Sequence, residues 1–268
     1  MRELAARHGV RPRKALGQHF LVDPNLARSI VRWAEVAPGN RVLEVGAGLG
    51  SLTVELARSA ERVVAVEVDE AAASALRDVT RDHANVDVLV GDALALDWPS
   101  VLSGNDWKMV SNLPYNVAVP LLMGMLETAP TVRDLTVMVQ REVGERLVAG
   151  PGEEQYGAVS VRTAYYTDRR AIRRVPPSVF WPEPTVDSVI VRLIRRPPPV
   201  PTPRELLFSV VDEGFAQRRK TMRNALVRMG MEPSTARAAL AECGVEANAR
   251  AEELDLPAFA CLADAIRG

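Results

Sequence analysis

The chain has 268 residues, of which 47% are hydrophobic and 25% charged, a composition ordinary for a soluble globular protein with a sizeable core. Its length suits one large domain, or a main domain with a smaller one. The longest apolar stretch, near residues 117–126, contains Pro120 and is too short to cross a bilayer, which excludes a membrane-spanning helix. The N-terminus is charged and has no continuous apolar core, so we expect no signal peptide.

The net charge of −1 hides an uneven distribution of charge along the chain. Residues 40–110 carry 12 acidic and 6 basic side chains, whereas residues 162–196 carry 8 arginines and 3 acidic side chains. Residues 1–14 carry 5 basic side chains and 1 acidic one. This segregation predicts a surface that faces a polyanion.

Cys243 and Cys261 are the two cysteines, and their spacing is unlike that of a metal site. We expect both to be reduced, unpaired and buried among helices, as is usual in a cytoplasmic protein.

The first half of the chain alternates between strand and helix patterns. After a basic arm or loop at 1–19, a helix is predicted at 23–36, where Asp23 can cap and Pro24 fits the first helical position. The segments that follow are, in chain order, a strand within 38–48, a helix at 52–60, a strand at 62–69, a helix at 70–83, a strand at 86–92, a strand before residue 112, a helix at 119–128 and a strand at 135–140. This alternation predicts an α/β fold with a parallel, doubly wound sheet and helices on both faces.

Residues 160–176 and 188–196 are predicted to add later strands, antiparallel to the others. Five prolines within residues 197–203 then predict a stiff extended linker. Beyond it, helices are predicted in 205–230, which stops at Gly230, in 232–244 and in 254–268. The predicted domains are a main domain at 1–196 with a basic N-terminal arm, the linker at 197–203 and a small all-helical domain at 204–268.

The segment LEVGAGLGSLT (43–53) places Gly46, Gly48 and Gly50 between a strand and a helix. Glycine suits a backbone with positive φ and a close approach of ligand to main chain. The dinucleotide pattern G-x-G-x-x-G is not met, because Ser51 takes the place of its third glycine, so pyrophosphate binding is disfavoured. The glycines either form only a strand–helix turn or approach a smaller ligand that contains adenosine.

Two acidic residues favour the ligand. Glu67 ends the second strand, 21 positions after Gly46, where a carboxylate can accept hydrogen bonds from both ribose hydroxyls. Asp92 ends the third strand, where it can accept a hydrogen bond from an adenine amine. Because ligands bind at the carboxyl ends of strands in open α/β sheets, these features predict a single pocket, and the ligand that fits them is S-adenosylmethionine.

The tetrapeptide NLPY (112–115) follows the fourth strand and is either a surface turn or a chemical site. The Asn112 side-chain oxygen and the Leu113 carbonyl can accept both N–H bonds of an adenine amine and draw its nitrogen toward tetrahedral geometry. Pro114 stiffens the loop, and Tyr115 offers a ring on which an extruded base can stack. Phe180, between prolines in VFWPEPTVDSVIVRL (179–193), is predicted to cover the other side of the base, with Trp181 packing beneath it.

Segments along nearly the whole chain resemble the ribosomal RNA adenine dimethyltransferase family, and within it the type that modifies two adjacent adenines near the 3′ end of small-subunit rRNA. The matching segments are RPRKALGQHFLVD (11–23), LEVGAGLGSLT (43–53), VSNLPYNVAVPLL (110–122), MVQREVGERLVAGPG (138–152), QYGAVSV (155–161), VFWPEPTVDSVIVRL (179–193) and FAQRRKTMRNAL (215–226). The chain departs from the family at His19, where Asn is common, and at Ala47, where Pro is frequent.

The resemblance implies a Rossmann-like class I methyltransferase fold that uses S-adenosylmethionine, with S-adenosylhomocysteine as product and no metal. It implies that the cofactor is bound by His19, Leu21, Gly46, Glu67, Asp92 and Asn112. It also implies that the target adenine meets the NLPY loop (Asn112, Leu113, Pro114, Tyr115) and Phe180. The expected activity is N6,N6-dimethylation of two adjacent adenines of 16S rRNA within the assembling small ribosomal subunit, by a monomer.

Basic side chains near the cofactor segment and in the tail are predicted to contact RNA phosphates, which gives the domain at 204–268 an RNA-docking role. They are Arg11, Arg13, Lys14, Arg218, Arg219, Lys220 and Arg223, and their alternative role is a solvated charged face.

Three other functions stay open: methylation of large-subunit rRNA, methylation of DNA, and binding without catalysis. The segment FAQRRKTMRNAL together with the tail favours small-subunit rRNA, and the helical tail is short for a DNA-reading region. The joint presence of Glu67, Asp92, Asn112 and Tyr115 favours an enzyme.

Overall fold

The computed structural model describes residues 1–13, 17–217 and 220–267, so that Lys14, Arg218 and Arg219 lie outside the described residues. The chain divides into two compact units. The first comprises Met1–Gly144 and Arg169–Arg195, and the second comprises Glu145–Asp168 and Arg196–Gly268.

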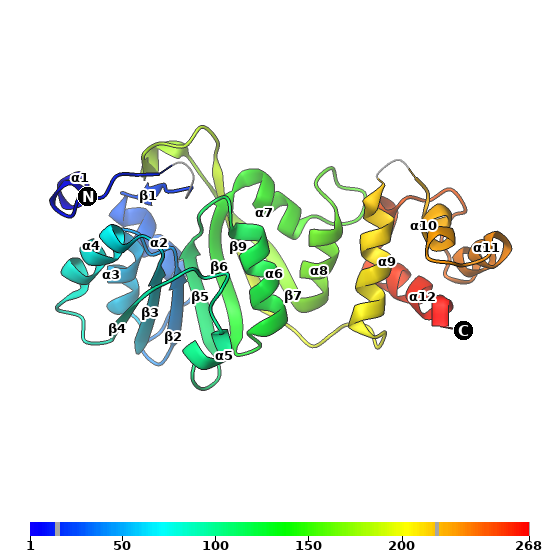
Figure 1. The fold of residues 1–268 in the computed structure, drawn as a ribbon, viewed down its shortest axis with the longest axis horizontal. Helices are drawn as coiled ribbons and strands as arrows, with labels where there is room; N and C mark the ends of the chain where they lie inside the picture. Colours follow the sequence, from blue (N-terminus) through cyan, green and yellow to red (C-terminus); the bar gives the residue numbers. More distant parts are fainter. Residues whose placement is uncertain (14–16, 218–219, 268) are drawn as a thin grey trace. The chain divides into compact units, whose positions relative to one another are not determined.

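A seven-stranded sheet with the order β4-β3-β2-β5-β6-β9-β7 forms the centre of the α/β fold (Figure 1). Its strands are β2 (Arg41–Val45), β3 (Arg62–Glu67), β4 (Val86–Val90), β5 (Trp107–Asn112), β6 (Val132–Gln140), β7 (Thr167–Val175) and β9 (Ser188–Arg195). The strands β2 to β6 are parallel, and β9 runs antiparallel to β6. The predicted parallel sheet and its later antiparallel strand at 188–196 are therefore confirmed.

The direction of the strand order explains why helices cover both faces of the sheet. From β2 through α3 (Ser51–Ala57), β3 and α4 (Glu70–Thr80) to β4, the chain moves toward one edge. From β5 through α6 (Ala118–Thr128) to β6, it moves toward the other edge. Because parallel crossovers are right-handed, this reversal puts α6 on the face opposite α3 and α4. The reversal occurs between β2 and β5, and such a switch point is where open α/β sheets bind ligands.

The helix α2 (Pro24–Trp33) begins as its sequence predicts. The Asp23 side chain accepts hydrogen bonds from the main-chain N–H groups of Asn25 and Leu26, and Pro24 takes the first helical position. Its buried residues Ile30 and Val31 join an apolar cluster with Leu52 and Leu56 of α3. These contacts place α2 and α3 on the same face of the sheet.

The segment before α2 differs from the predicted arm. Residues Arg2–Arg7 form the helix α1, and Phe20–Leu21 form a short strand, β1, antiparallel to β8 (Phe180–Trp181). The helix α1 packs against α4, and His8 contacts Ser74 and Asp78 there. The sequence analysis missed α1 because a helix of 6 residues, three of them charged, is too short to show a clear apolar periodicity. Two more short helices, α5 (Trp98–Val101) and α7 (Arg141–Val148), were not predicted either.

The second unit is helical. It contains α8 (Ala158–Tyr166), α9 (Arg204–Ala216), α10 (Met222–Arg228), α11 (Pro233–Glu242) and α12 (Leu256–Arg267). The prediction of a strand over 160–176 is half wrong, because its first half is α8 and only the second half is β7. Gly230 has a positive φ of 98° after α10, as expected of a helix stop.

The compact units do not divide where the sequence predicted its domains. Residues 145–168 were assigned to the main domain, but α8 packs against α9 and α12. Tyr165 and Tyr166 stack edge-on against Phe208 of α9, with ring centroids 5.2 and 5.9 Å apart. This aromatic packing is why α8 belongs to the second unit. The functional domains at 1–196 and 204–268 stay a prediction.

The expectation of two unpaired, buried cysteines is wrong. Cys243, which caps α11, and Cys261 of α12 form a disulfide across a Cα–Cα distance of 5.7 Å. Cys243 is half-buried and Cys261 is exposed. The packing of α11 against α12 brings these two cysteines together, and their spacing along the chain does not indicate this pairing.

Within the described residues, no helix has both the length and the apolar character required to cross a membrane.

Candidate active site

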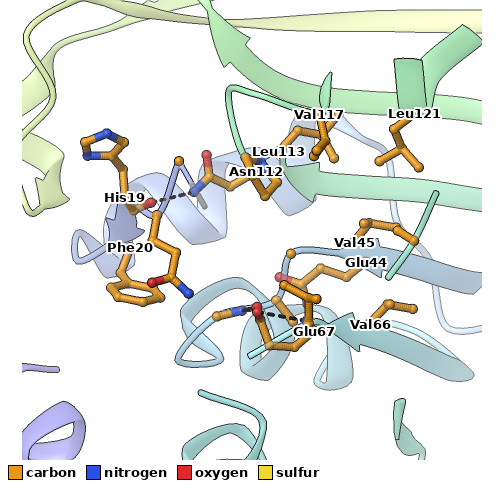
Figure 2. Close-up of a pocket in the computed structure, with 18 of the residues that line it drawn as sticks. His19, Phe20, Glu44, Val45, Val66, Glu67, Asn112, Leu113, Val117 and Leu121 are labelled. Carbon is orange, nitrogen blue, oxygen red and sulfur yellow. Dashed lines mark hydrogen bonds between the residues drawn. The ribbon is translucent and has the colours of Figure 1, made fainter. Parts of the chain in front are cut away.

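A cavity of about 290 Å³ lies in the first unit, where β2, β3 and β5 end (Figure 2). Segments from five parts of the chain line it: residues 17–21, the loop after β2, the end of β3, residues 91–94 and the loop after β5. The predicted site residues among its lining are His19, Leu21, Gly46, Glu67, Asp92, Asn112, Leu113, Pro114 and Tyr115. The structure thus brings together residues separated by almost 100 positions, at the switch point of the sheet.

The Gly-rich turn after β2 has the backbone that its sequence predicts. Gly46, Gly48 and Gly50 have φ values of 73°, 56° and 83°, which residues other than glycine rarely adopt. A Cβ on Gly46 would lie 2.8 Å from the Cδ atom of Pro114, and one on Gly48 would lie 2.8 Å from the ring of Phe20. The glycines therefore let the NLPY loop and the segment before α2 approach the turn closely.

Ser51, which breaks the dinucleotide pattern, has its own role in the site. Its hydroxyl donates a hydrogen bond to the main-chain oxygen of Leu21 at 2.5 Å. This bond connects the start of α3 to the segment at 17–21 that forms one wall of the cavity.

Glu67 is 5% exposed and its carboxylate accepts three main-chain N–H groups. Oε2 accepts from Gly48 at 2.8 Å, and Oε1 accepts from Val68 and Asp69 at 3.0 Å each. Burial raises the pKa of Glu67, and these hydrogen bonds lower it. A carboxylate offers about four acceptor positions, so one remains, on Oε2. This capacity is available to a ribose hydroxyl, and the hydrogen bonds of Glu67 to both hydroxyls stay a prediction.

Asp92 lies at the exposed rim of the same cavity. Its Oδ1 atom accepts a hydrogen bond from the N–H of Leu94 at 2.9 Å, which fixes the side chain at the start of a turn. The carboxylate keeps acceptor capacity for a polar group that enters from the rim.

Asn112 ends β5, and its side-chain amide has a defined direction. Nδ2 donates a hydrogen bond to the main-chain oxygen of His19 at 3.0 Å (Figure 2). Because the oxygen of His19 can only accept, the amide nitrogen must face it, and Oδ1 is turned away as an acceptor. The next peptide is anchored as well, since the N–H of Leu113 donates to the oxygen of Met138 on β6 at 3.0 Å.

His19 contributes its main chain to Asn112 and its side chain to a second contact. The Nδ1 atom lies 2.7 Å from the main-chain oxygen of Pro182, so that Nδ1 carries the proton and donates it. The imidazole also lies beside the Tyr115 ring, with centroids 5.2 Å apart. Since the Asn112 contact uses the main chain of residue 19, it does not depend on which side chain stands there.

The ring of Tyr115 is held at both ends. Its hydroxyl forms a hydrogen bond of 2.7 Å with Ser188 Oγ on β9, and burial raises the pKa of the phenol. The ring is half-buried and lines the cavity. It can therefore present a fixed aromatic surface to a flat ligand.

Phe180 does not line this cavity, in contrast to its prediction. It is 4% exposed and belongs to the apolar cluster that contains Leu21, to which it is paired in the β1–β8 ladder. Adjacent residues on a strand point in opposite directions, so Trp181 turns the other way and stacks on Phe20 at 6.0 Å. The alternation of β8 thus buries Phe180 in the core behind the cavity.

The lining residues that the sequence analysis did not single out include Gln18, Phe20 and Glu44. Phe20 covers the glycine turn. Gln18 Nε2 and Glu44 Oε2 are buried polar atoms without a hydrogen-bond partner among the described residues. The one available signal was a glutamate inside the otherwise apolar strand pattern LEV (43–45).

The described residues predicted to bind RNA are exposed or partly so. Arg11, Arg13 and Lys220 are exposed, and Arg13 Nε lies 3.9 Å from Asp69 Oδ2. Arg223 is half-buried with its Nε unpaired. The strand β7 also contains arginines, of which Arg170 and Arg173 are exposed. Among the described residues, no group of three or more His, Cys, Asp or Glu side chains is arranged to hold a metal.

Comparison with known proteins gives consistent matches over nearly the full chain. The family model for ribosomal RNA adenine dimethylase matches residues 9–266. Ribosomal RNA small subunit methyltransferase A of Kineococcus radiotolerans is 46% identical over 269 residues, covering 98% of this chain and 89% of that protein. The protein of the same name in Thermobifida fusca is 45% identical over 270 residues, covering 98% of this chain and 93% of its own length.

Two solved structures are similar in fold. A dimethyladenosine transferase from Plasmodium falciparum gives a TM-score of 0.79 with 25% identity, covering 91% of this chain and 96% of that one. The 23S rRNA methyltransferase ErmE gives a TM-score of 0.73 with 27% identity, covering 93% of this chain and all of that one.

Proposed function

The chain belongs to the ribosomal RNA adenine dimethylase family, and we propose that it dimethylates the N6 atoms of two adjacent adenines near the 3′ end of small-subunit rRNA. The family and the class I methyltransferase fold that the sequence resemblance implied are confirmed. The enzyme is an rRNA methyltransferase that depends on S-adenosylmethionine. The observation that carries the proposal about the site is the fixed amide of Asn112.

The backbone and the polar groups of the cavity suit the cofactor. Gly46 and Gly48 provide backbone that a ligand can approach, and Glu67 has one free acceptor position for a ribose hydroxyl. Gln18 offers a buried, unpaired donor and Glu44 a buried, unpaired acceptor. A donor and an acceptor together match the carboxylate and the ammonium of an amino-acid group. When bound, the cofactor supplies a methyl group on a positively charged sulfur, which needs no further activation.

The NLPY loop suits the adenine amine. The lone pair of this amine is delocalised into the ring, which makes the nitrogen a weak nucleophile. Asn112 Oδ1 and the Leu113 oxygen would accept its two N–H bonds, localise the lone pair and stabilise positive charge on nitrogen. The proton leaves after nitrogen has gained its methyl group, so these two acceptors and correct alignment are sufficient without a strong base.

Tyr115 would stack on the target base, with its ring fixed through Ser188 and His19. Phe180 supports the site from behind, through Leu21, instead of covering the second side of the base.

Small-subunit rRNA is favoured over the large-subunit alternative. The two relatives at 45–46% identity are named small subunit methyltransferases, whereas the 23S rRNA enzyme ErmE is 27% identical. We propose that Arg11, Arg13, Lys220 and Arg223, together with the arginines of β7, contact rRNA phosphates. The substrate is then the assembling small ribosomal subunit in the cytoplasm, and the enzyme acts as a monomer without a metal.

The test is transfer of a labelled methyl group from S-adenosylmethionine to small ribosomal subunits that lack the modification, followed by mapping of the modified bases. We expect label on two adjacent adenines near the 3′ end. Label on large-subunit rRNA would support the alternative substrate, and cofactor binding without transfer to any rRNA would support a binding protein.

Asn112→Ala is expected to lower transfer by at least 100-fold, because it removes one of two charge-stabilising acceptors. The matched control is Asn105→Ala, an exposed asparagine just before β5, at the opposite end of the same strand. Asn112→Ala with full activity would contradict the role of Asn112.

A further inference from the structure

Glu44 is a buried carboxyl of the cavity, and its protonation state decides whether it can pair with a cation. Glu44 lies next to the last residue of β2, is 2% exposed and lines the cavity together with Glu67 (Figure 2). Its Oε2 atom has no hydrogen-bond partner among the described residues. A buried polar atom without a partner is unfavourable, so a ligand that supplies a partner gains affinity from it.

The charge state of Glu44 follows from its surroundings. Burial raises its pKa to about 8, and repulsion by Glu67 acts in the same direction. The hydroxyl of Thr53 on α3 lies beside the carboxyl and lowers the pKa somewhat, but it does not complete a hydrogen bond, since Thr53 Oγ1 also has no partner. At pH 7 the group therefore carries its proton in most molecules.

The other charged groups near Glu44 do not neutralise it. Among the described residues no lysine or arginine lines the cavity, whose remaining titratable side chains are His19, Glu67, Asp92 and Tyr115. On α3, Glu55 is paired with Arg28 and Arg58. On β5, Lys108 is paired with Asp134. The part of the cavity that the structure describes thus has three carboxyl groups and no permanent positive charge, which favours a cationic ligand.

We propose that Glu44 releases its proton to solvent when the cofactor binds, and that its carboxylate then pairs with a cationic group of the cofactor. This inference rests on the proposed function insofar as it takes S-adenosylmethionine as the ligand. Two groups of that molecule have the required charge, the ammonium of the amino acid and the sulfonium. In both cases the ion pair replaces a protonated carboxyl that has an unsatisfied oxygen.

The pairing makes cofactor affinity depend on pH. Below pH 8, binding must remove the proton from Glu44, so the affinity rises up to tenfold for each pH unit. Above pH 8, Glu44 is already ionised in the free protein and the dependence ends. Glu44→Gln keeps the shape and the neutral state of the side chain but has no proton to lose.

The experiment is titration calorimetry at pH 7 in buffers with different heats of ionisation, which counts the protons released on binding. The ligands are S-adenosylmethionine, S-adenosylhomocysteine, which lacks the sulfonium, and 5′-methylthioadenosine, which lacks both cationic groups. The proteins are the wild type, Glu44→Gln, and Glu55→Gln as a control that removes a neighbouring carboxyl from α3. Thermal unfolding of each free variant shows that it is folded.

We expect the wild type and Glu55→Gln to release close to one proton with S-adenosylmethionine and none with 5′-methylthioadenosine. Glu44→Gln should release about one proton fewer, and its Kd should exceed that of the wild type by tenfold or more at pH 8 while approaching it at pH 6. Equal release with S-adenosylhomocysteine identifies the ammonium as the partner, and release with S-adenosylmethionine alone identifies the sulfonium.

Equal proton release by the wild type and Glu44→Gln would overturn the proposal, as would a ratio of their Kd values that does not change with pH. These outcomes are separate from the rRNA assay. An enzyme that methylates small-subunit rRNA without this proton release keeps its proposed function and loses the proposed role of Glu44. A protein that releases the proton but methylates a different RNA keeps the proposed role of Glu44 and loses its proposed function.

Discussion

Gly48 is a residue at which backbone and packing both exclude a side chain. Its φ is 56°, and a Cβ there would lie 2.8 Å from the ring of Phe20, which lines the cavity. Gly48→Ala should therefore lower the free energy of unfolding by about 1–3 kcal/mol. It should also weaken cofactor binding, because the N–H of residue 48 orients Glu67. Urea unfolding and calorimetric titration measure the two effects.

The control for Gly48 is Gly39→Ala, since Gly39 has ordinary φ and no atom within 4 Å of an added Cβ. That variant should keep its stability within about 0.5 kcal/mol or gain slightly. If the two alanine variants were equally stable, the crowding at Gly48 would not be the constraint that its geometry indicates.

Glu44 gives a second expectation, for the free protein. Its pKa is about 8 in the folded state against 4.5 when unfolded, so between these values the folded state binds more protons. The stability that Glu44 contributes is complete below pH 4.5 and is lost as the pH rises through 8. As the pH rises across this interval, the free energy of unfolding of Glu44→Gln should therefore increase relative to that of the wild type by about 1.4 kcal/mol per pH unit. Chemical unfolding at pH 5, 6.5 and 8 tests this slope, and a constant difference would contradict it.

At the scale of secondary structure, Tyr115 connects the loop after β5 to the antiparallel strand β9. Tyr115→Phe removes the hydrogen bond to Ser188 but keeps the ring, so it should cost about 1 kcal/mol of stability and little activity. Tyr115→Ala also removes the stacking surface and should lower transfer by roughly 5–150-fold, equivalent to about 1–3 kcal/mol.

Ser188→Ala is the matched partner variant, because it removes the same hydrogen bond from the other side. The double variant with Tyr115→Phe should be hardly less stable than either single one. Additive losses would show that the two hydroxyls act independently. Full transfer activity in Tyr115→Ala would contradict the stacking role.

The elements that the sequence predicts well are those whose periodicity is set by one buried face. The β2–α3–β3–α4–β4 succession is of this kind. The cap at Asp23 was predictable from its residue type, and the pocket was predictable because parallel strands end at one edge of the sheet. Two errors have a different origin. The strand predicted at 160–176 is partly the helix α8, whose aromatic residues pack on a distant helix, α9. Phe180 is buried because of its pairing with Leu21, which is 159 positions away. Local patterns carry no information about such partners.

At the scale of the whole chain, a near-neutral net charge conceals the separation of acidic and basic side chains along the sequence. Most acidic side chains of the first unit lie within residues 40–110, while basic ones concentrate at residues 1–14 and along 162–196. Composition alone therefore gave no indication of a nucleic-acid partner, and only the distribution along the sequence did. The disulfide between Cys243 and Cys261 could not be foreseen in the same way, because the distance between α11 and α12 is a property of their packing.

The charge pattern leads to a prediction about RNA binding that uses the basic segment at 218–220. Each phosphate contact that is lost reduces the salt dependence of binding by about 0.7–0.9 in the slope of log K against log salt concentration. Replacing Arg218, Arg219 and Lys220 by alanine should therefore flatten that slope by about 2 and weaken binding to the small subunit most strongly at low salt. Cofactor affinity, measured by calorimetric titration, should not change.

The control is an alanine triple variant of Arg58, Arg77 and Arg81, exposed arginines within the acidic region 40–110. Both variants lose three positive charges, so a general effect of net charge would flatten the two slopes equally. If the segment at 218–220 contacts phosphates, only its variant changes the slope, because Arg58 and Arg81 already face the carboxylates of Glu55 and Asp78. Filter binding from 50 to 300 mM salt distinguishes the two results, and equal slopes would return residues 218–220 to an ordinary solvated surface.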